Sequence, residues 1–199
     1  MTLDDVEPAA ALQSLSFPPP FPADLLWQPS HLQRHLELFP EGQFVAEADG
    51  EIVASCSNTI ISEALWQSHE SWSATVGGPL LDKFDRQGTT LYGLDITVHP
   101  DFRRMGIGRE FYSERFALVE RLGLSRYGTA CRLPDFRRYR TENANSTPEI
   151  YARAVANGGA TDRTLTPLLR YGLSLLGVIE NYMEDEESCN AAALLEKAR

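Results

Sequence analysis

Residues 98–109 read VHPDFRRMGIGR, and this stretch decides the fold. The apolar run Leu91–Val98 before it predicts a buried strand. Apolar residues after it recur at helical spacing and predict a helix that ends at Gly123. A strand, a tight turn and a helix start thus follow one another. Glycine at positions 106 and 108 lets such a turn adopt positive φ and lets a ligand approach the main chain closely.

This turn predicts a pyrophosphate site. Successive N–H groups in a turn of this kind form an anion-binding nest, and the helix behind adds the positive end of its dipole. Arg104 and Arg109 are placed to add charge-assisted hydrogen bonds. The turn is not a P-loop, because G-x-x-x-x-G-K-[ST] is absent. It is not a dinucleotide fingerprint either, because Phe111 stands where G-x-G-x-x-G needs glycine.

The composition supports a local anion site on an otherwise acidic protein. The chain has 199 residues, 43% of them hydrophobic, and a formal net charge of −10, which argues against a nucleic-acid or anionic-membrane binder. Residues 101–140 nevertheless hold ten arginines against five acidic residues. A basic segment on an acidic chain suits a small anion better than a long polyanion.

The cysteines and the N-terminus indicate the compartment. Cys56, Cys131 and Cys189 are far apart with no C-x-x-C, so we expect neither a disulfide framework nor a zinc site. No apolar run approaches eighteen residues, and the acidic N-terminus has no signal-peptide pattern. We expect a cytoplasmic protein that binds no metal and no membrane.

The pattern along the chain predicts an α/β architecture in the order α-α-β-β-β-α-β-α-α-β-β. A hairpin is expected around Asp49-Gly50, and residues 63–90 are expected to be an irregular loop. The remaining elements are helices near 2–15, 31–39, 148–157 and 162–171, and strands at 126–133, 173–182 and 191–196.

The form [R/Q]-x-x-G-x-G after a V-x-P strand end resembles the acyl-CoA site of the GNAT superfamily of N-acyltransferases. Flanking stretches within residues 43–196 are similar to a bacterial branch that is sometimes fused to a carbon–nitrogen hydrolase: LYGLDITVHPDFR at 91–103, CRLPD at 131–135, PEIY at 148–151 and an acidic tail before Ala191.

The resemblance implies one GNAT-like domain over residues 1–199, with a central mixed β-sheet flanked by helices and splayed between the family's fourth and fifth strands. The family opens with a strand before its first helix, but Met1 is followed almost at once by a helix. Either that first strand is lost or the given start of the sequence is late; we favour the late start and expect an exposed sheet edge. An open edge and the habits of the superfamily make a homodimer reasonable.

The resemblance further implies an N-acetyltransferase that moves an acetyl group from acetyl-CoA to a primary amine, on a small molecule or a peptide, by direct attack in a ternary complex. Pantetheine would pair with the main chain of Ile96 and Val98, and the Val98 N–H would stabilise the oxyanion. The other cofactor-binding residues that it implies are Arg103, Arg104, Met105, Gly106, Ile107, Gly108 and Arg109.

The catalytic groups are less well defined. Asp95 is the first candidate for the base, and a water-relayed Glu63 or Glu70 is the next. The tyrosine that usually acts as the acid aligns, by way of Gly172, with Leu168. Tyr171, Tyr139 or Tyr182 could substitute, or the CoA thiolate could leave unprotonated. A covalent route through Cys131 is conceivable, although nothing near it in sequence lowers its pKa.

The sequence also leaves other functions and other residue roles open. A non-catalytic acyl-CoA-binding or sensor module is the alternative, which the leucine at 168 and the missing strand favour, and a thioesterase is third. His31 and His35 lack a third metal ligand and are expected on the solvated surface. Trp66 and Trp72 either line the acceptor pocket or pack on the sheet. The arginines at 137, 138 and 140 either reach the CoA 3′-phosphate or form a solvated face.

Overall fold

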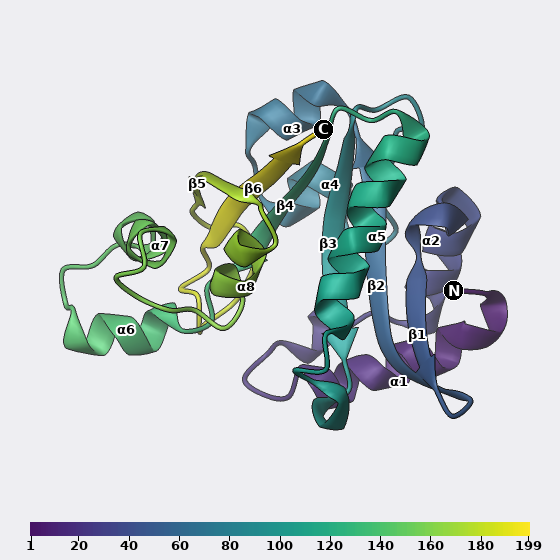
Figure 1. Cartoon of the computed structure of the whole chain (residues 1–199), viewed down its shortest axis with the longest axis horizontal. Helices are drawn as coiled ribbons and strands as arrows, with labels where there is room; N and C mark the ends of the chain where they lie inside the picture. The colour runs from purple at the N-terminus through teal and green to yellow at the C-terminus, as the bar shows by residue number, and fades with distance from the viewer.

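In the computed structural model, which describes residues 1–199, six strands form one mixed sheet in the order β1-β2-β3-β4-β6-β5, with helices on both faces (Figure 1). The strands are β1 Phe44–Ala48, β2 Glu51–Ile61, β3 Thr90–Val98, β4 Arg126–Arg132, β5 Ser174–Ile179 and β6 Ala192–Ala198. The helices are α1 Val6–Ser16, α2 Pro29–Leu38, α3 Glu63–Ser68, α4 Trp72–Val76, α5 Ile107–Leu122, α6 Phe136–Glu142, α7 Pro148–Ala156 and α8 Leu165–Arg170.

The sheet opens between β3 and β4, its only parallel neighbours. These strands pair over three positions only, Thr90–Tyr92 against Arg126–Gly128, and then diverge, as Figure 1 shows. β4 continues to pair with β6 along its whole length, so the opening separates two otherwise intact half-sheets. This confirms the predicted splay, because β3 and β4 are the family's fourth and fifth strands when its first strand is absent.

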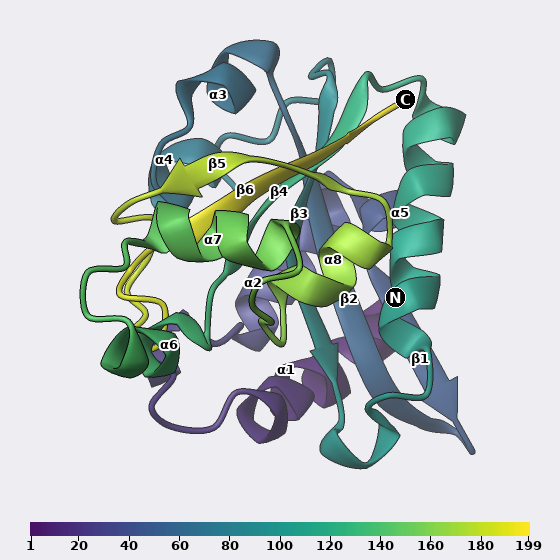
Figure 2. The same cartoon turned by 60° about the vertical axis from the view of Figure 1, so that its left-hand side comes forward.

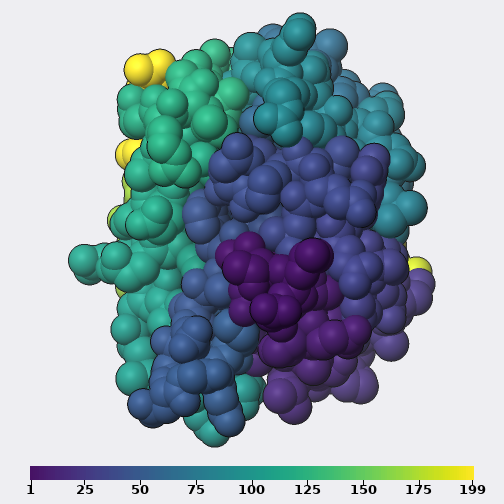
Figure 3. Space-filling model, turned by 90° about the vertical axis from the view of Figure 1, so that its right-hand side faces the viewer, coloured from purple at the N-terminus to yellow at the C-terminus, as the bar shows by residue number.

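No strand precedes α1, as expected. Residues Leu3–Asp5 form a short 3-10 helix, and β1 is an edge strand that pairs with β2 alone. The β1–β2 hairpin turns at Asp49 and Gly50, whose φ values of 52° and 84° fit the left-handed turn that the sequence predicts. Figure 3 shows the segment nearest the N-terminus at the centre of the face that lies beside this edge.

The two faces of the sheet carry different helices, and strand alternation decides which residues each face receives. On β3, Leu91 joins a cluster with Leu118 of α5, whereas its neighbour Tyr92 packs with Trp66 of α3 on the other face. Figure 2 shows α5, α7 and α8 on the near side, while α1 and α2 lie behind the sheet. A ligand in the splay therefore meets α5 and α8 on one side and the N-terminal helices on the other.

Two expectations about local structure were wrong. Residues 63–90 are not all irregular, because α3 and α4 lie there, capped by the hydroxyl groups of Ser62 and Ser71. His35 is not solvated: it is fully buried, and its Nε2 lies 2.8 Å from the carbonyl of Pro79. A helix α6, which the sequence did not predict, follows β4.

Candidate functional site

The glycine turn presents a row of free main-chain donors at the start of α5. None of the N–H groups of residues 104–109 donates a hydrogen bond within the protein. Arg104 and Gly106 have φ values of 64° and 92°, which turn successive N–H groups toward one side. A Cβ atom at Gly106 or Gly108 would meet nothing within 4 Å, so the space beside the turn is open. The geometry fits a pyrophosphate.

The side chain of Arg103 contacts the main chain of the protein itself. Its guanidinium group donates to the carbonyl of Val98 at 3.2 Å and to that of Ser16 at 3.0 Å. It thereby ties the turn to the end of β3 and to α1. Arg103 is therefore a positioning residue for the turn, whereas the side chains of Arg104 and Arg109 are exposed beside it.

The main chain of Ile96 and Val98 faces the splay. The N–H of His99 donates to Val53 of β2 at 2.9 Å. Since main-chain groups of an antiparallel strand point alternately to and from the neighbouring strand, Val98 and Ile96 point away from β2, into the opening. The Val98 carbonyl already accepts hydrogen bonds from Ser16 and Arg103, so only its N–H is available to a ligand.

A cavity of about 340 Å³ occupies the splay and reaches both faces of the sheet. On the first face its walls are Gly108, Tyr112 and Arg115 of α5 together with Pro167, Leu168 and Tyr171. On the second face they are Gln13, Phe17, Phe21, Leu25, Trp27 and Trp72. Between them lie Asp95 on β3 and Cys131 on β4. The cavity thus connects the side of the glycine turn with the side of the N-terminal helices.

Asp95 faces the N-terminal helices because β3 contains a bulge. Asn58 pairs with Gly93 and its neighbour Ser57 pairs with Asp95, so Leu94 is an extra residue on β3. A bulge of this kind shifts the alternation of side chains by one residue. Asp95 would otherwise share a face with Gly93, on the α5 side.

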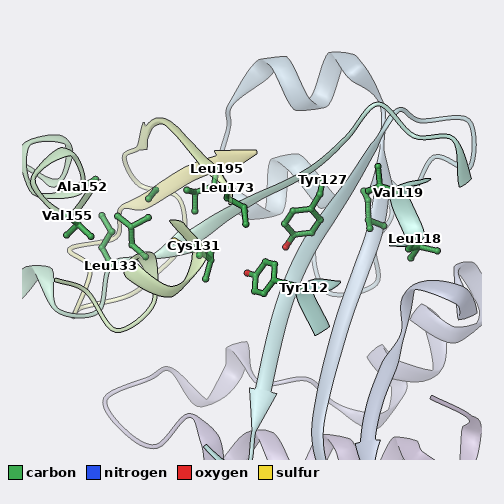
Figure 4. Close-up of a cluster of buried hydrophobic side chains, with 14 of the residues drawn as sticks. Tyr112, Leu118, Val119, Tyr127, Cys131, Leu133, Ala152, Val155, Leu173 and Leu195 are labelled. Atoms are coloured by element: carbon green, nitrogen blue, oxygen red, sulfur yellow. The ribbon is translucent and has the colours of Figure 1, made fainter. Parts of the chain in front are cut away.

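Arg115 stabilises the bulge from the opposite face. Its side chain is 2% exposed and donates to Asn58 Oδ1 at 2.7 Å and to the carbonyls of Asp95 and Ser57 at 2.8 and 3.2 Å. The guanidinium carbon also lies 5.1 and 5.3 Å from the ring centroids of Tyr112 and Tyr127. Figure 4 shows these two rings next to each other beside β3. Arg115 makes no ion pair with a carboxylate, and its Nη1 has no hydrogen-bond partner in the protein.

The Asp95 carboxyl group is held from one side only. Its Oδ2 accepts from the Gln13 amide at 3.0 Å and from the Thr97 hydroxyl at 3.1 Å, while Oδ1 is buried without a partner. The indole Nε1 of Trp27 is likewise buried and unpaired. Burial raises the pKa of Asp95, and the Trp27 indole, the positive charge of Arg115 and the hydrogen bonds from Thr97 and Gln13 oppose that rise. A carboxylate with a raised pKa is a better proton acceptor for an ammonium group.

Tyr171 is the best placed of the candidate acids. It lines the cavity one turn after Leu168, and its ring lies 5.2 Å from that of Tyr112. Tyr182 also lines the cavity, but its hydroxyl lies 2.8 Å from that of Tyr92, and burial raises its pKa well above the usual value. Tyr139 packs on Tyr151 and does not reach the cavity.

The remaining catalytic candidates fit less well. Glu63 lies outside the cavity, where Arg126 holds its carboxylate at 2.5 Å and lowers its pKa to about 2. Glu70 is exposed and also outside. Cys131 lines the cavity, but burial raises the pKa of its thiol, so the nucleophilic thiolate is disfavoured.

The two tryptophans of the 63–90 segment have different roles. Trp66 is buried against Gly128, where any larger residue would collide with its ring. Trp72 lines the cavity and lies 5.8 Å from Trp27, centroid to centroid. The arginines of α6 belong to the solvated face: Arg137 pairs with Glu186 and Arg138 with Asp135.

Sequence reasoning missed most of the residues that line the cavity, among them Gln13, Trp27 and Arg115, which surround Asp95. Each of these three reaches the site from an element distant in sequence, and Gln13 is 82 residues from Asp95. No group of three or more His, Cys, Asp or Glu side chains is placed to hold a metal ion. None of the helices combines the length and the apolar character needed to cross a bilayer.

The acetyltransferase (GNAT) family model matches residues 7–140. Two proteins of Bacillus subtilis (strain 168) are each 33% identical to the chain. One is YkwB, described as an uncharacterized N-acetyltransferase; the match covers 98% of this chain and 85% of YkwB. The other is YhcX, described as a probable hydrolase; the match covers 96% of this chain but 36% of YhcX, a much longer protein.

Solved structures share the fold. A GphF GNAT-like decarboxylase in complex with isobutyryl-CoA has a TM-score of 0.84 at 24% identity, covering 100% of this chain and 96% of its own. The loading GNATL domain of CurA from Lyngbya majuscula has a TM-score of 0.83 at 17% identity, covering 100% and 94%. The ribosomal-protein-S18-alanine N-acetyltransferase of Escherichia coli has a TM-score of 0.55 at 15% identity, covering 100% and 90%.

Proposed function

The chain belongs to the GNAT family of acetyltransferases, and on that premise we propose that it transfers an acetyl group from acetyl-CoA to a primary amine. The observation that carries the proposal is the row of unpaired N–H groups at 104–109 beside a cavity that leads through the splay to Asp95. The row suits the pyrophosphate of CoA, and the cavity suits its pantetheine arm on one face and an amine on the other. The three free thiols fit a reducing compartment such as the cytoplasm.

Each step of the transfer has a candidate group. Asp95 takes a proton from the ammonium group, and the amine nitrogen then attacks the thioester carbon. The Val98 N–H, which points into the splay, stabilises the negative charge that develops on the carbonyl oxygen. The carbon–sulfur bond then breaks, an amide remains, and the sulfur accepts a proton from Tyr171 or leaves as the thiolate.

Calorimetric titration with acetyl-CoA tests the donor site. Gly106→Glu places a carboxylate at the phosphate site, so we expect at least a tenfold loss of affinity. Gly158→Glu is the matched control, because Gly158 also has positive φ and open space at its Cβ position but follows α7. Equal affinity in both variants would refute the donor site. Amine-dependent release of CoA thiol from the wild-type protein then tests the transfer.

A non-catalytic acyl-CoA-binding module is the contrasting function. The leucine at 168, in place of the usual tyrosine, favours it. The continuation of the cavity beyond the splay to a buried carboxylate favours an enzyme, because a sensor for the donor needs no acceptor space. Tight binding of acetyl-CoA without thiol release across a broad amine panel would support the module.

Decarboxylation of an acyl-CoA is a second candidate reaction, which the likeness to GphF raises. The observation that favours it is Arg115, a buried cation that lines the cavity without a carboxylate partner and could bind an acyl carboxylate. The bond from that carboxylate to its carbon would break, carbon dioxide would leave, and the enolate carbon would accept a proton from protonated Asp95. Malonyl-CoA separates the two reactions: a decarboxylase converts it to acetyl-CoA without an amine, whereas the transferase leaves it intact.

A further inference from the structure

The part of the cavity behind the splay has apolar walls. Its side chains come from the segment after α1 and from α4: Phe17, Phe21, Leu25, Trp27, Trp72 and Leu94 of β3. We call this space the acceptor chamber. The ring centroids of Trp27 and Trp72 are 5.8 Å apart and those of Phe17 and Phe21 are 5.1 Å apart. Four aromatic side chains on the walls favour an apolar occupant.

The acceptor chamber has one uncompensated charge, and it is negative. Arg132 reaches its rim above the ring of Phe21, but two hydrogen bonds of 2.7 Å to Asp185 and one of 3.0 Å to Glu187 neutralise it. Asp95 has no ion-pair partner, and its Oδ1 has no hydrogen-bond donor. An unpaired carboxylate in an apolar space is stabilised by an incoming cation.

The size and the polarity of the chamber restrict the chemical group that can be attached to that cation. The whole cavity, about 340 Å³, is at the small end of ligand pockets and also has to admit the thioester. Among the six side chains of the chamber walls only the indoles of Trp27 and Trp72 carry a hydrogen-bond donor, and the Trp27 indole already interacts with Asp95. A polyamine or a peptide would leave several of its polar groups without partners there, which costs binding free energy.

We propose that the acceptor is a small primary amine on an aromatic or branched apolar group, bound with its ammonium group at Asp95 and its apolar group against the aromatic side chains of the chamber. This inference rests on the proposed transferase function and names its substrate class. It assigns Phe21, Leu25 and Trp72 as specificity-determining residues, which touch the apolar group and not the reacting atoms.

Three matched probes test the two parts of the proposal: 2-phenylethylamine, ethanolamine and 2-phenylethanol. Ethanolamine lacks the apolar group that the chamber would bind, and 2-phenylethanol lacks the ammonium group that Asp95 would bind. We expect kcat/KM for 2-phenylethylamine to exceed that for ethanolamine about 30-fold or more, the ratio that burial of a phenyl group supplies. Calorimetry on protein saturated with CoA gives a readout that needs no turnover. There 2-phenylethylamine should bind at least tenfold more tightly than 2-phenylethanol, and Asp95→Asn should remove that difference.

Leu25→Ala tests the apolar wall. It should lower the preference for 2-phenylethylamine over ethanolamine about fivefold and leave the KM for acetyl-CoA unchanged. Leu176→Ala is the control, since Leu176 is an exposed leucine on β5, outside the cavity. An unchanged preference in Leu25→Ala and in Phe21→Ala would overturn the assignment of the walls.

The outcomes distinguish failure of the inference from failure of the proposed function. If both amines are acetylated at similar rates, the transferase stands and the inference on the acceptor falls. If acetyl-CoA binds and no amine releases thiol, the proposed function falls, and tight binding of 2-phenylethylamine by calorimetry would still support the chamber. Equal, weak binding of all three probes would overturn the inference, whether the protein transfers an acetyl group or decarboxylates an acyl-CoA.

Discussion

Asp95 combines a position set by one extra residue in β3 with an environment that leaves half of its carboxyl group unpaired. The bulge at Leu94 places it behind the sheet, and Gln13 holds Oδ2 while Oδ1 stays free. These two features make Asp95 the base in the proposed transfer. The same buried, half-unpaired carboxylate favours activity and lowers the stability of the fold.

We expect Asp95→Asn to lower kcat about 100-fold or more, the range of general-base effects, with the affinity for acetyl-CoA retained. The same change should stabilise the fold at pH 7. Because burial raises the folded-state pKa of Asp95, its protonated form stabilises the fold at low pH, and that contribution is lost as pH rises through the folded pKa. Amine-dependent thiol release and denaturant unfolding measure the two effects. A variant that is both active and less stable would contradict them.

Tyr171 is expected to help the sulfur leave, with a modest effect. A thiol has an ordinary pKa near 8.5, so the thiolate is already a fair leaving group without an acid. We expect Tyr171→Phe to lower kcat on the order of tenfold across the pH–rate profile, at or below the small end of acid–base effects. Tyr139→Phe, outside the cavity, is the matched control. Equal profiles for the two variants would exclude Tyr171 as the acid.

At the scale of elements, Arg115 connects α5 to the bulge that places Asp95. Arg115→Met removes the buried donor and leaves Asn58 Oδ1 and the carbonyls of Ser57 and Asp95 without it. We expect a loss of about 2–4 kcal/mol in the free energy of unfolding, since each buried acceptor left unpaired costs about 1–3 kcal/mol. Acetyl-CoA should still bind while kcat falls, because Asp95 shifts.

Denaturant unfolding and the split between kcat and the KM for acetyl-CoA check this prediction. Arg121→Met, at the exposed end of the same helix, is the control for removing a positive charge from α5. If Arg115→Met changes the KM for acetyl-CoA and leaves kcat intact, Arg115 contacts the donor and does not position Asp95.

The elements that the sequence predicts are those whose signals are local. The glycine turn, α5 with its Gly123 cap and the β1–β2 hairpin each follow from neighbouring residues, and all three form as expected. The caps of α3 and α4 are local signals too, since the hydroxyl groups of Ser62 and Ser71 each accept a hydrogen bond from the N–H three residues later.

The candidate site could be predicted only in part, because only some of its residues are joined by a local sequence signal. The phosphate turn lies within one contiguous motif, so its residues could be assigned directly. Gln13 and Arg115 form hydrogen bonds to Asp95 because distant segments fold together, and no spacing in the sequence joins them. Arg103 matches the motif, but whether it holds a ligand or its own chain depends on the position of α1.

At the scale of the whole molecule, the packing of α2 under the acceptor chamber makes stability depend on pH. His35 follows Leu32 by three positions and shares its buried face of α2, where its ring lies 5.0 Å from that of Trp27. Burial lowers the pKa of His35 to about 4. The unfolded chain therefore binds a proton near pH 6.5 that the folded protein accepts only near pH 4.

This difference predicts that stability falls as pH decreases through that window. A shift from about 6.5 to about 4 corresponds to a loss of about 3 kcal/mol in the free energy of unfolding between pH 7 and pH 4. Denaturant unfolding as a function of pH should show a steeper slope for the wild type than for His35→Gln, which keeps a side-chain donor near the Pro79 carbonyl. His69→Gln, a change at an exposed histidine, should follow the wild type. Parallel curves for the wild type and His35→Gln would mean that the ring is solvated in solution.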